Sequence, residues 1–470
     1  MRIVSWKLGV RSSNTRIPFR YGRACLTECP QALLQVQFET DGQSVEGYAA
    51  DCLPPLWFDK DATRDYEQQI GDMVAVISTA SEAVRDEGEF GNVLQALAIA
   101  EKADFDMQRP ALLHAFGVSM IERAIVDAYC RVVGRPFREL LSSGFLYEGQ
   151  SVRLEGVSTM VDVVPWEKDL TSSEMFVRHT VGMGDPLSTA DIQVDDCLND
   201  GRPQSLEQYI VESGIRYFKI KIGNRGREDL DRIRAVQEIL QANNVESYQL
   251  TIDGNEQYSS FEEFGEFWYA FERDESLQPI YNAVIGIEQP INRSQAFESA
   301  ALQGLEQIAK QTPVIIDESD ATRETCLRAL ECGYSGTSSK ACKGITKALL
   351  NRQLIQEYRR KGDRPYLMTA EDLCCVGVVA LQTDLALVSA MGLRHVERNG
   401  HHYHPGLAYL EEDSYQAVLA AHGDLYEVVK GVPSVKVVDG IISLRTVNEN
   451  GFGWKVDPRF ESYQVVNASS

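Results

Sequence analysis

The sequence has 470 residues, a hydrophobic fraction of 44%, a charged fraction of 24% and a formal net charge of −23. A chain of this length exceeds what one hydrophobic core usually supports, so we expect two or more domains. The acidic balance argues against a nucleic-acid partner, because phosphate binding needs a basic surface, and no apolar run approaches the roughly 20 residues of a membrane span.

The ten cysteines show no zinc-binding spacing. Cys374 and Cys375 are adjacent, and Cys25 and Cys29 have no second pair in register. A disulfide framework is not expected in so large a chain. The first residues, 1–7, lack the apolar core of a signal peptide. We therefore expect reduced thiols in a cytoplasmic protein.

The first third of the chain reads as an α+β domain, residues 1–150. Short alternating runs over residues 1 to about 60 predict a small antiparallel sheet, which two loops interrupt, at 16–22 and 52–57. From about 61 to 140 the hydrophobic period is helical. An amphipathic helix is predicted over residues 120–129, and Gly134-Arg135-Pro136 ends it.

In the middle of the chain, short apolar runs alternate with helical segments. This alternation predicts a parallel sheet covered by helices, and six successive units favour a closed barrel over an open sheet. We assign residues 151–415 to the barrel. The strands are predicted at 218–222, 248–252, 283–287, 314–316, a run ending near 339, and 366–369, and the helices at 228–242, 261–273, 298–310, 323–332, 345–360 and 376–391.

The tail returns to strand and turn signals from about residue 425. Asp439-Gly440 is a typical hairpin turn between apolar runs. We expect residues 416–470 to pack back on the N-terminal domain.

Each predicted strand of the middle region ends in an ionisable residue. The carboxyl ends of parallel barrel strands converge on one mouth, where active sites of this architecture lie. In chain order these residues are Lys219 with Lys221, Asp253, Glu288, Asp317 with Glu318, Lys340, and Glu371 with Asp372.

The carboxylates of Asp253, Glu288 and Asp317 follow three adjacent strands, so we expect them to meet. Three carboxylates repel one another unless a cation neutralises them. Oxygen ligands of this kind, completed by water, suit Mg²⁺, with Mn²⁺ as a substitute.

Lys219 and Lys221 lie two residues apart, so both side chains point to the same face of the strand. Facing the helices they would be buried charges without a partner, whereas facing inward they meet the metal and its carboxylates. A lysine crowded by a second lysine and a cation has a depressed pKa and can act as a base. Lys340 comes from a strand across the barrel, so a substrate between them has a lysine on each face. With a metal to stabilise the resulting charge, this arrangement can remove a proton α to a carboxylate.

Five segments carry a family resemblance: Lys219-Ile220-Lys221-Ile222-Gly223, Ile252-Asp253-Gly254-Asn255, Ile287-Glu288-Gln289-Pro290, Pro313 to Ser319, and Ser338-Ser339-Lys340. With their intervals of roughly 25 to 35 residues, they resemble the mandelate racemase/muconate lactonizing enzyme branch of the enolase superfamily. The resemblance implies an α/β fold, a modified (β/α)₇β barrel with an N-terminal α+β capping domain, and a homo-oligomer. Lys340 and Glu371 place the chain nearer the two-lysine pattern of the lactonizing enzymes than the Asp–His pattern of mandelate racemase.

The resemblance also implies roles for individual residues. Asp253, Glu288 and Asp317 become the ligands of one Mg²⁺, Lys221 the base with Lys219 tuning its pKa, and Lys340 the acid or base on the other face. Glu371 would lie at the end of the seventh strand. The capping-domain loops at 16–22 and 52–58 become lids over the substrate. The candidate substrate contacts are Arg16, Phe19, Arg20, Tyr21, Trp57, His179, Asn255, Glu318 and His402.

Several interpretations stay open at this point. The run from Lys340 to Gly344 is one residue shorter than is usual in the family, so Lys343 is an alternative to Lys340. His179 and Trp57 could serve packing alone. His401, His402 and His404 could bind a transition metal, but a loop role is favoured.

The reaction is also open. Two lysines on opposite faces permit epimerisation, cycloisomerisation or dehydration of a small carboxylate, such as an acid sugar, a dipeptide or an aromatic acid. The alternatives are a metal-dependent hydrolase and a barrel that binds metal and ligand without catalysis.

Overall fold

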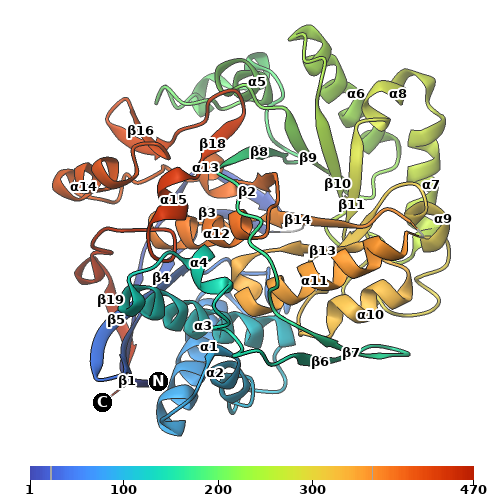
Figure 1. Cartoon of the computed structure of the whole chain (residues 1–470). Coiled ribbons are helices and arrows are strands. Elements are labelled where there is room, and N and C mark those ends of the chain that lie inside the picture. Colours follow the sequence, from blue (N-terminus) through green and yellow to red (C-terminus); the bar gives the residue numbers. More distant parts are fainter. Residues whose placement is uncertain (22–23, 363, 470) are drawn as a thin grey trace.

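Eight parallel strands close into a barrel in the computed structural model, which describes residues 1–21, 24–362 and 364–469 (Figure 1). The last barrel strand pairs with both the seventh and the first, which completes the ring. A short strand, β18 (Ile441–Ser443), adds to the first barrel strand in antiparallel orientation. The barrel strands are β8 (Glu174–Val181), β9 (Tyr217–Lys221), β10 (Gln249–Asp253), β11 (Val284–Glu288), β12 (Val314–Ile316), β13 (Gly336–Ser339), β14 (Leu367–Glu371) and β15 (His395–Glu397).

Helices cover the outside of the barrel (Figure 1). The clearest example is α7 (Phe261–Arg273), where Phe264, Trp268 and Phe271 recur at helical spacing and are buried. Ser260 caps this helix by accepting a hydrogen bond from the Glu263 N–H. The other helices of this layer are α5 (Leu206–Ser213), α6 (Arg227–Ala242), α8 (Gln278–Tyr281), α9 (Leu305–Ala309), α10 (Thr325–Cys332), α11 (Ile345–Lys361), α12 (Val379–Ala390) and α13 (Asn399–Tyr403).

One predicted helix is much shorter than expected. The sequence predicts a helix over 298–310, but the structure has turns before α9, which begins at Leu305. Gly304, immediately before it, has a φ of +96°, a left-handed conformation that a continuous helix does not contain.

An antiparallel sheet covered by helices forms the cap (Figure 1). Its strand order is β19-β1-β4-β5, so the C-terminal strand joins the N-terminal sheet. The fold-class prediction is therefore confirmed. The strands are β1 (Arg2–Arg11), β4 (Gln31–Thr40), β5 (Gln43–Cys52) and β19 (Gln464–Ala468), the helices are α1 (Tyr66–Glu87), α2 (Val93–Ala100), α3 (Ala111–Val133) and α4 (Phe137–Leu141), and β2 (Asn14–Tyr21) with β3 (Ala24–Glu28) forms a separate hairpin.

A buried ion pair ties the central cap helix to the cap sheet. The Arg123 guanidinium of α3 lies 2.9 Å from the Asp51 carboxylate of β5 and also donates to the Ala50 carbonyl. Two small hairpins and the C-terminal helices complete the chain. They are β6 (Val152–Glu155) with β7 (Met160–Val163), β16 (Tyr426–Val429) with β17 (Val432–Val435), α14 (Glu412–His422) and α15 (Arg445–Glu449). Across the described residues, every helix is too short or too polar to traverse a bilayer.

Candidate active site at the barrel mouth

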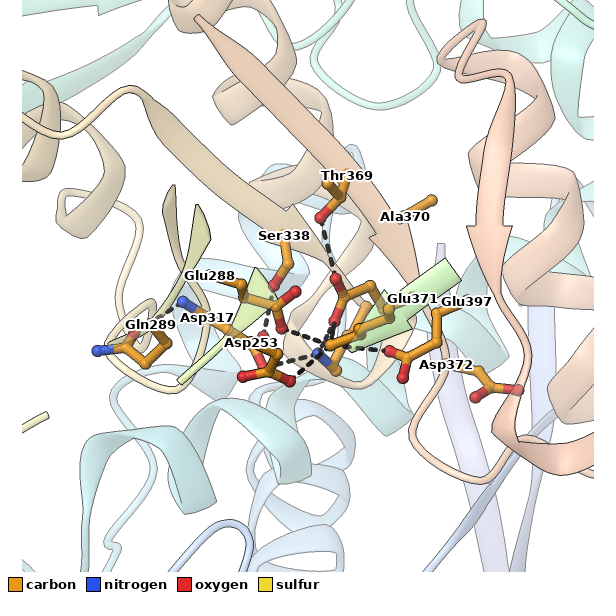
Figure 2. A network of polar contacts seen from close by, with 12 residues as sticks. Asp253, Glu288, Gln289, Asp317, Ser338, Thr369, Ala370, Glu371, Asp372 and Glu397 are labelled. Carbon is orange, nitrogen blue, oxygen red and sulfur yellow. Dashed lines mark hydrogen bonds and ion pairs between the residues drawn. The ribbon is translucent and has the colours of Figure 1, made fainter. Parts of the chain in front are cut away.

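A lysine surrounded by carboxylates occupies the centre of the barrel mouth. The Lys219 ammonium donates to Glu288 at 2.6 Å and to Glu371 and Glu397 at 3.0 Å each. It also lies 3.1 Å from Asp253. Figure 2 shows the carboxylates turned toward this point. Burial opposes the charge of Lys219, but the carboxylates, Asp253 foremost, hold its pKa well above the ordinary value.

The alternation of strand β9 explains why both lysines enter the barrel. Lys219 and Lys221 point inward and turn Phe218 and Ile220 toward the helices. The Lys221 ammonium donates to the Asn255 side chain at 2.6 Å and to Asp253 at 3.0 Å. The inward direction predicted from the sequence is what the structure has.

Among the residues of this arrangement the pKa of Lys221 is raised, whereas the depression expected from the sequence involves a divalent cation as well. Burial disfavours its charge, yet the Asp253 carboxylate, together with Glu397 and Glu288, outweighs burial and raises the pKa above the ordinary value. The sequence argument counted a second lysine and a divalent cation as neighbours. Lys219 is such a neighbour and lowers the pKa of Lys221, but the attraction of the carboxylates around the ammonium prevails.

Lys340 and Lys343 both approach Asp317 from the opposite side. The Lys340 ammonium lies 2.6 Å from Glu371 and 2.7 Å from Asp317, with the Trp57 ring 5.5 Å away. The Lys343 ammonium donates to the Ser338 carbonyl at 2.8 Å and to Asp317 at 3.1 Å. Lys340 therefore shares the Glu371 carboxylate with Lys219, whereas Lys343 is bound between Asp317 and the strand β13 backbone.

Three buried carboxylates could hold a divalent cation. Glu288, Asp317 and Glu371 each offer an oxygen within 4.8 Å of the other two. The Glu288 Oε2 atom is buried without a hydrogen-bond partner in the described part of the chain. Burial and the Glu371 charge also raise the pKa of Glu288 well above its ordinary value. An all-oxygen group with one unsatisfied buried atom fits a hard cation such as Mg²⁺.

Two residues of this centre were missed by the sequence analysis. Glu397 ends β15 and accepts from Lys219, while Thr180 of β8 donates to its other oxygen. Arg178 lies fully buried inside the barrel and donates to Glu371 at 2.7 Å. The rule that a barrel strand ends in an ionisable residue would have found Glu397, but β15 has only three residues and shows no periodicity.

Glu371 is the most completely bound carboxylate of the centre. Arg178 and Thr369, the latter at 3.0 Å, donate to its Oε1, and Lys219 and Lys340 donate to its Oε2. Burial opposes its ionisation, but the two lysines and Arg178 hold the pKa of Glu371 well below the ordinary value. Asp372, the next residue, points away from this centre (Figure 2) and accepts from the backbone of α13.

The candidate lid residues occupy different surroundings. Arg16 donates to Asp200 at 2.9 Å and to the Pro203 carbonyl at 3.0 Å. Phe19 is buried and stacks on Tyr403, with ring centroids 4.1 Å apart. Among the lid residues whose side chains are described, Trp57 reaches the lysine centre. The side chain of Tyr21 lies outside the described part of the chain.

The structure places His179 in the helix layer and not in the barrel interior. Arg178 and Thr180 point inward, so strand alternation turns His179 outward. Its ring lies 4.2 Å from Tyr209 and 4.5 Å from His402, and His402 in turn contacts the Tyr209 hydroxyl. Within the described residues, no group of histidines brings three ligand atoms within 4.8 Å of one another.

Glu318 lies beside the centre without an ion pair among the described residues. Its Oε2 is buried without a hydrogen-bond partner there. Burial and the adjacent Asp317 charge raise the pKa of Glu318 to about 7.

Comparison with known proteins identifies the architecture. The model of the family "Enolase C-terminal domain-like" matches residues 203–459. The structure resembles a mandelate racemase/muconate lactonizing protein from Herpetosiphon aurantiacus, with 16% identity, a TM-score of 0.63, and coverage of 97% of this chain and 99% of that one.

Two further solved structures are similar over nearly the whole chain. An N-succinyl Arg/Lys racemase from Bacillus cereus has 15% identity and a TM-score of 0.63, with 100% and 99% of the two chains covered. A dipeptide epimerase from Enterococcus faecalis, in complex with Mg and a dipeptide, has 14% identity and a TM-score of 0.61, with 96% and 99% covered. No curated protein sequence matches the chain. The family model spans more than half of the sequence, and the chain therefore belongs to the mandelate racemase/muconate lactonizing enzyme family of the enolase superfamily.

Proposed function

We propose that this protein is a Mg²⁺-dependent enzyme that removes the proton α to the carboxylate of a small substrate. The observation that carries the proposal is the placement of Lys221 and Lys340 on opposite sides of one buried carboxylate group. A substrate carboxylate bound at this group would present its α carbon between two ammonium groups, which is the geometry that proton transfer on either face requires.

Asp253, Glu288 and Asp317 are the proposed ligands of the metal. When bound, Mg²⁺ supplies the Lewis acidity that stabilises negative charge on the substrate carboxylate. Glu371 is the alternative third ligand, because its oxygen lies within 4.8 Å of those of Glu288 and Asp317. Glu371 is the less favoured ligand, because its carboxylate already accepts hydrogen bonds, two of them from Arg178 and Thr369 in the barrel interior.

The ion pairs distinguish the proposed roles of the two lysines. Lys221 contacts a single carboxylate, Asp253, so it is the more readily deprotonated and serves as the base. Lys340 contacts two carboxylates, Asp317 and Glu371, which keep it protonated, and burial does not outweigh their effect on its pKa. Lys340 therefore holds the proton that is returned to the other face or passed to a leaving group. Lys219, among four carboxylates, stays cationic and positions them.

The products depend on the substrate. Epimerisation, cycloisomerisation and dehydration are all compatible with one lysine on each face of the substrate. Solved relatives include an N-succinyl Arg/Lys racemase and a dipeptide epimerase, whose names describe small carboxylates that carry an α proton. These relatives support small carboxylates, dipeptides among them, as the first substrates to test.

The deciding experiment measures α-proton exchange. The protein is incubated with Mg²⁺ in D₂O with acid sugars, dipeptides, N-acylated amino acids and aromatic carboxylates, and deuterium incorporation is followed by NMR. We expect exchange with at least one class, and a loss of about 10²-fold to 10⁴-fold in Lys221→Ala, the range for a general base. Lys340→Ala should block exchange on the second face or product formation.

Lys310→Ala is the matched control, because Lys310 is an exposed surface lysine paired with Glu306 on α9. Undiminished exchange in Lys221→Ala and Lys340→Ala would exclude the proposed roles. Mg²⁺ binding without exchange of any substrate class would favour the catalytically silent barrel. Hydrolysis without α-exchange would favour the metal-dependent hydrolase, although the group found among the described residues that could hold a metal contains carboxylates only.

A further inference from the structure

The loop that carries Lys340 leads into a helix whose N-terminus is capped by a residue of the cap domain. Helix α11 begins at Ile345, and none of its own side chains caps it. The first N–H groups of a helix need acceptors when they are buried. Here the acceptor is Glu122 of cap helix α3, which receives the Ile345 N–H at 2.8 Å and the Thr346 N–H at 2.7 Å.

Both oxygens of Glu122 are used in this contact, one for each N–H group. The side chain is buried, and no lysine or arginine within the described ranges forms an ion pair with it. The positive end of the α11 dipole is thus the counter-charge of this carboxylate. A charged, two-point hydrogen bond of this type is stronger and more directional than a neutral one.

The backbone at Gly344 permits the close approach. Its φ is +109°, and a Cβ at this position would lie 3.3 Å from the Glu122 Oε2 atom. A side chain here would therefore be strained and would press on the carboxylate. Gly344 also ends the short turn Ala341–Lys343, so the chain passes from Lys340 to the capped helix in a few residues.

Because the connection from Lys340 to helix α11 is short, the contact with Glu122 bears on the position of Lys340. Strand β13 fixes the start of the segment at Ser339, and Glu122 fixes its end at Ile345. Between them, the Ala341 N–H donates to Asp384 of α12 at 3.2 Å. The Lys340 side chain, which reaches Asp317 and Glu371, starts from this tethered backbone.

We propose that Glu122 is a positioning residue, through which the cap domain fixes the Lys340–Gly344 segment and directs Lys340 to the barrel mouth. The effect on catalysis rests on the proposed function, but the effect on the segment does not. Removing the carboxylate should loosen the beginning of α11 and the lysine segment while the rest of the barrel remains unchanged.

The test compares two isosteric changes on the same helix. Glu122→Gln replaces one acceptor oxygen by an NH₂ group that faces a helix N–H. The control is Asp127→Asn, because Asp127 is equally buried on α3 but contacts Tyr48 and Arg131 within the cap. Hydrogen–deuterium exchange of the full chain with Mg²⁺ should be at least tenfold faster over residues 341–348 in Glu122→Gln, and unchanged there in Asp127→Asn.

A second readout follows the lysine itself. Brief acetylation with acetic anhydride, analysed by mass spectrometry, should label Lys340 several-fold faster in Glu122→Gln than in the parent protein. Gly344→Ala disturbs the same contact from the barrel side and should give the same signature, which keeps the test decisive if Glu122→Gln does not fold. If a substrate is found by α-exchange, its kcat should fall several-fold in both variants with little change in KM.

Unchanged exchange and labelling of this segment in both Glu122→Gln and Gly344→Ala would overturn the proposal. So would faster exchange spread evenly over cap and barrel, because that result indicates general destabilisation. If the parent protein exchanges no substrate proton, the proposed function fails, but hydrogen–deuterium exchange and acetylation still decide the role of Glu122.

Discussion

At the residue scale, the barrel mouth is a balance of charges. Five buried carboxylates face five cations, and each carboxylate has at least one cationic partner within 4 Å. Buried charges are tolerated only when they are paired in this way. The carboxylates are Asp253, Glu288, Asp317, Glu371 and Glu397, and the cations are Arg178, Lys219, Lys221, Lys340 and Lys343.

The partners of Asp253 and Glu371 distinguish these two candidates for the third metal ligand. Within the described residues the Asp253 Oδ1 atom accepts only the Asn255 N–H, and the Oδ2 atom is held by the ammonium groups of Lys219 and Lys221. Glu371 is held from the barrel interior by Arg178 and Thr369. We therefore expect Asp253→Asn, as the loss of a ligand, to weaken Mg²⁺ binding by more than about 100-fold, and Glu371→Gln to weaken it by about 10-fold to 100-fold, the range for an outer-shell partner.

Calorimetric titration with Mg²⁺ measures both affinities directly. Glu288→Gln serves as the positive control, because its unsatisfied oxygen makes it the firmest ligand candidate. Thermal unfolding of each variant without metal checks that the barrel is intact. A larger loss in Glu371→Gln than in Asp253→Asn would assign the third position to Glu371.

At the element scale, the order of the barrel strands was predictable because the burial pattern and the strand-end charges repeat. Asp253 and Glu288 could be placed since each ends a mainly apolar run, and Lys219 because it alternates with apolar residues. Glu397 could not, because His395–Glu397 is too short to show a period. The outward direction of His179 depends on the inward direction of Arg178, and one sequence does not reveal which residue of a buried strand faces the interior. The lid contacts depend on tertiary packing, such as Phe19 on Tyr403.

The end of helix α14 offers a test of pH-dependent stability. The ring of His422 has both nitrogens in use, since Nδ1 lies 3.0 Å from the Thr446 hydroxyl and Nε2 accepts the Lys455 N–H at 3.2 Å. Burial lowers the pKa of His422 to about 4, below the value of about 6.5 in an unfolded chain. The unfolded state therefore binds the proton more tightly, and this stabilising contribution, complete above pH 6.5, is lost as the pH falls from 6.5 toward 4.

We expect the free energy of unfolding to fall less between pH 7.5 and pH 5 in His422→Gln than in the parent protein, when both are measured by urea denaturation. Glutamine can donate and accept at the same positions but does not titrate. His114→Gln is the comparison and should change the pH dependence less, because burial lowers the pKa of His114 to a smaller extent. NMR titration of the His422 ring gives its pKa directly. Equal pH dependence of the parent protein and His422→Gln, or a His422 pKa near 6.5, would contradict the assignment.

At the scale of the whole molecule, the two ends of the chain meet in the cap (Figure 1). Strand β19 pairs with β1, and the Ser469 hydroxyl accepts the Trp6 N–H at 2.8 Å. Along the sequence, the barrel therefore lies between two strands that pair in one sheet of the cap. The side chains of β19 are all exposed, so this strand contributes hydrogen bonds and an edge but little apolar burial.

Deleting residues 464–470 should therefore cost little stability and instead promote association. We expect the melting temperature to fall by a few degrees, because about 1 kcal/mol corresponds to roughly 1 to 4 °C in a chain of this size. Strand β1 would then be an unpaired edge, which is a template for pairing with another chain. Size-exclusion chromatography with light scattering should show larger species for the deletion variant than for the parent protein. The same measurement gives the oligomeric state of the parent protein.

The double substitution Val465→Thr with Val466→Thr keeps the strand and is the control, which we expect to behave as the parent protein does. A fall of 15 °C or more would show that β19 supports the core, and an unchanged size distribution would contradict its proposed role in covering the edge of β1.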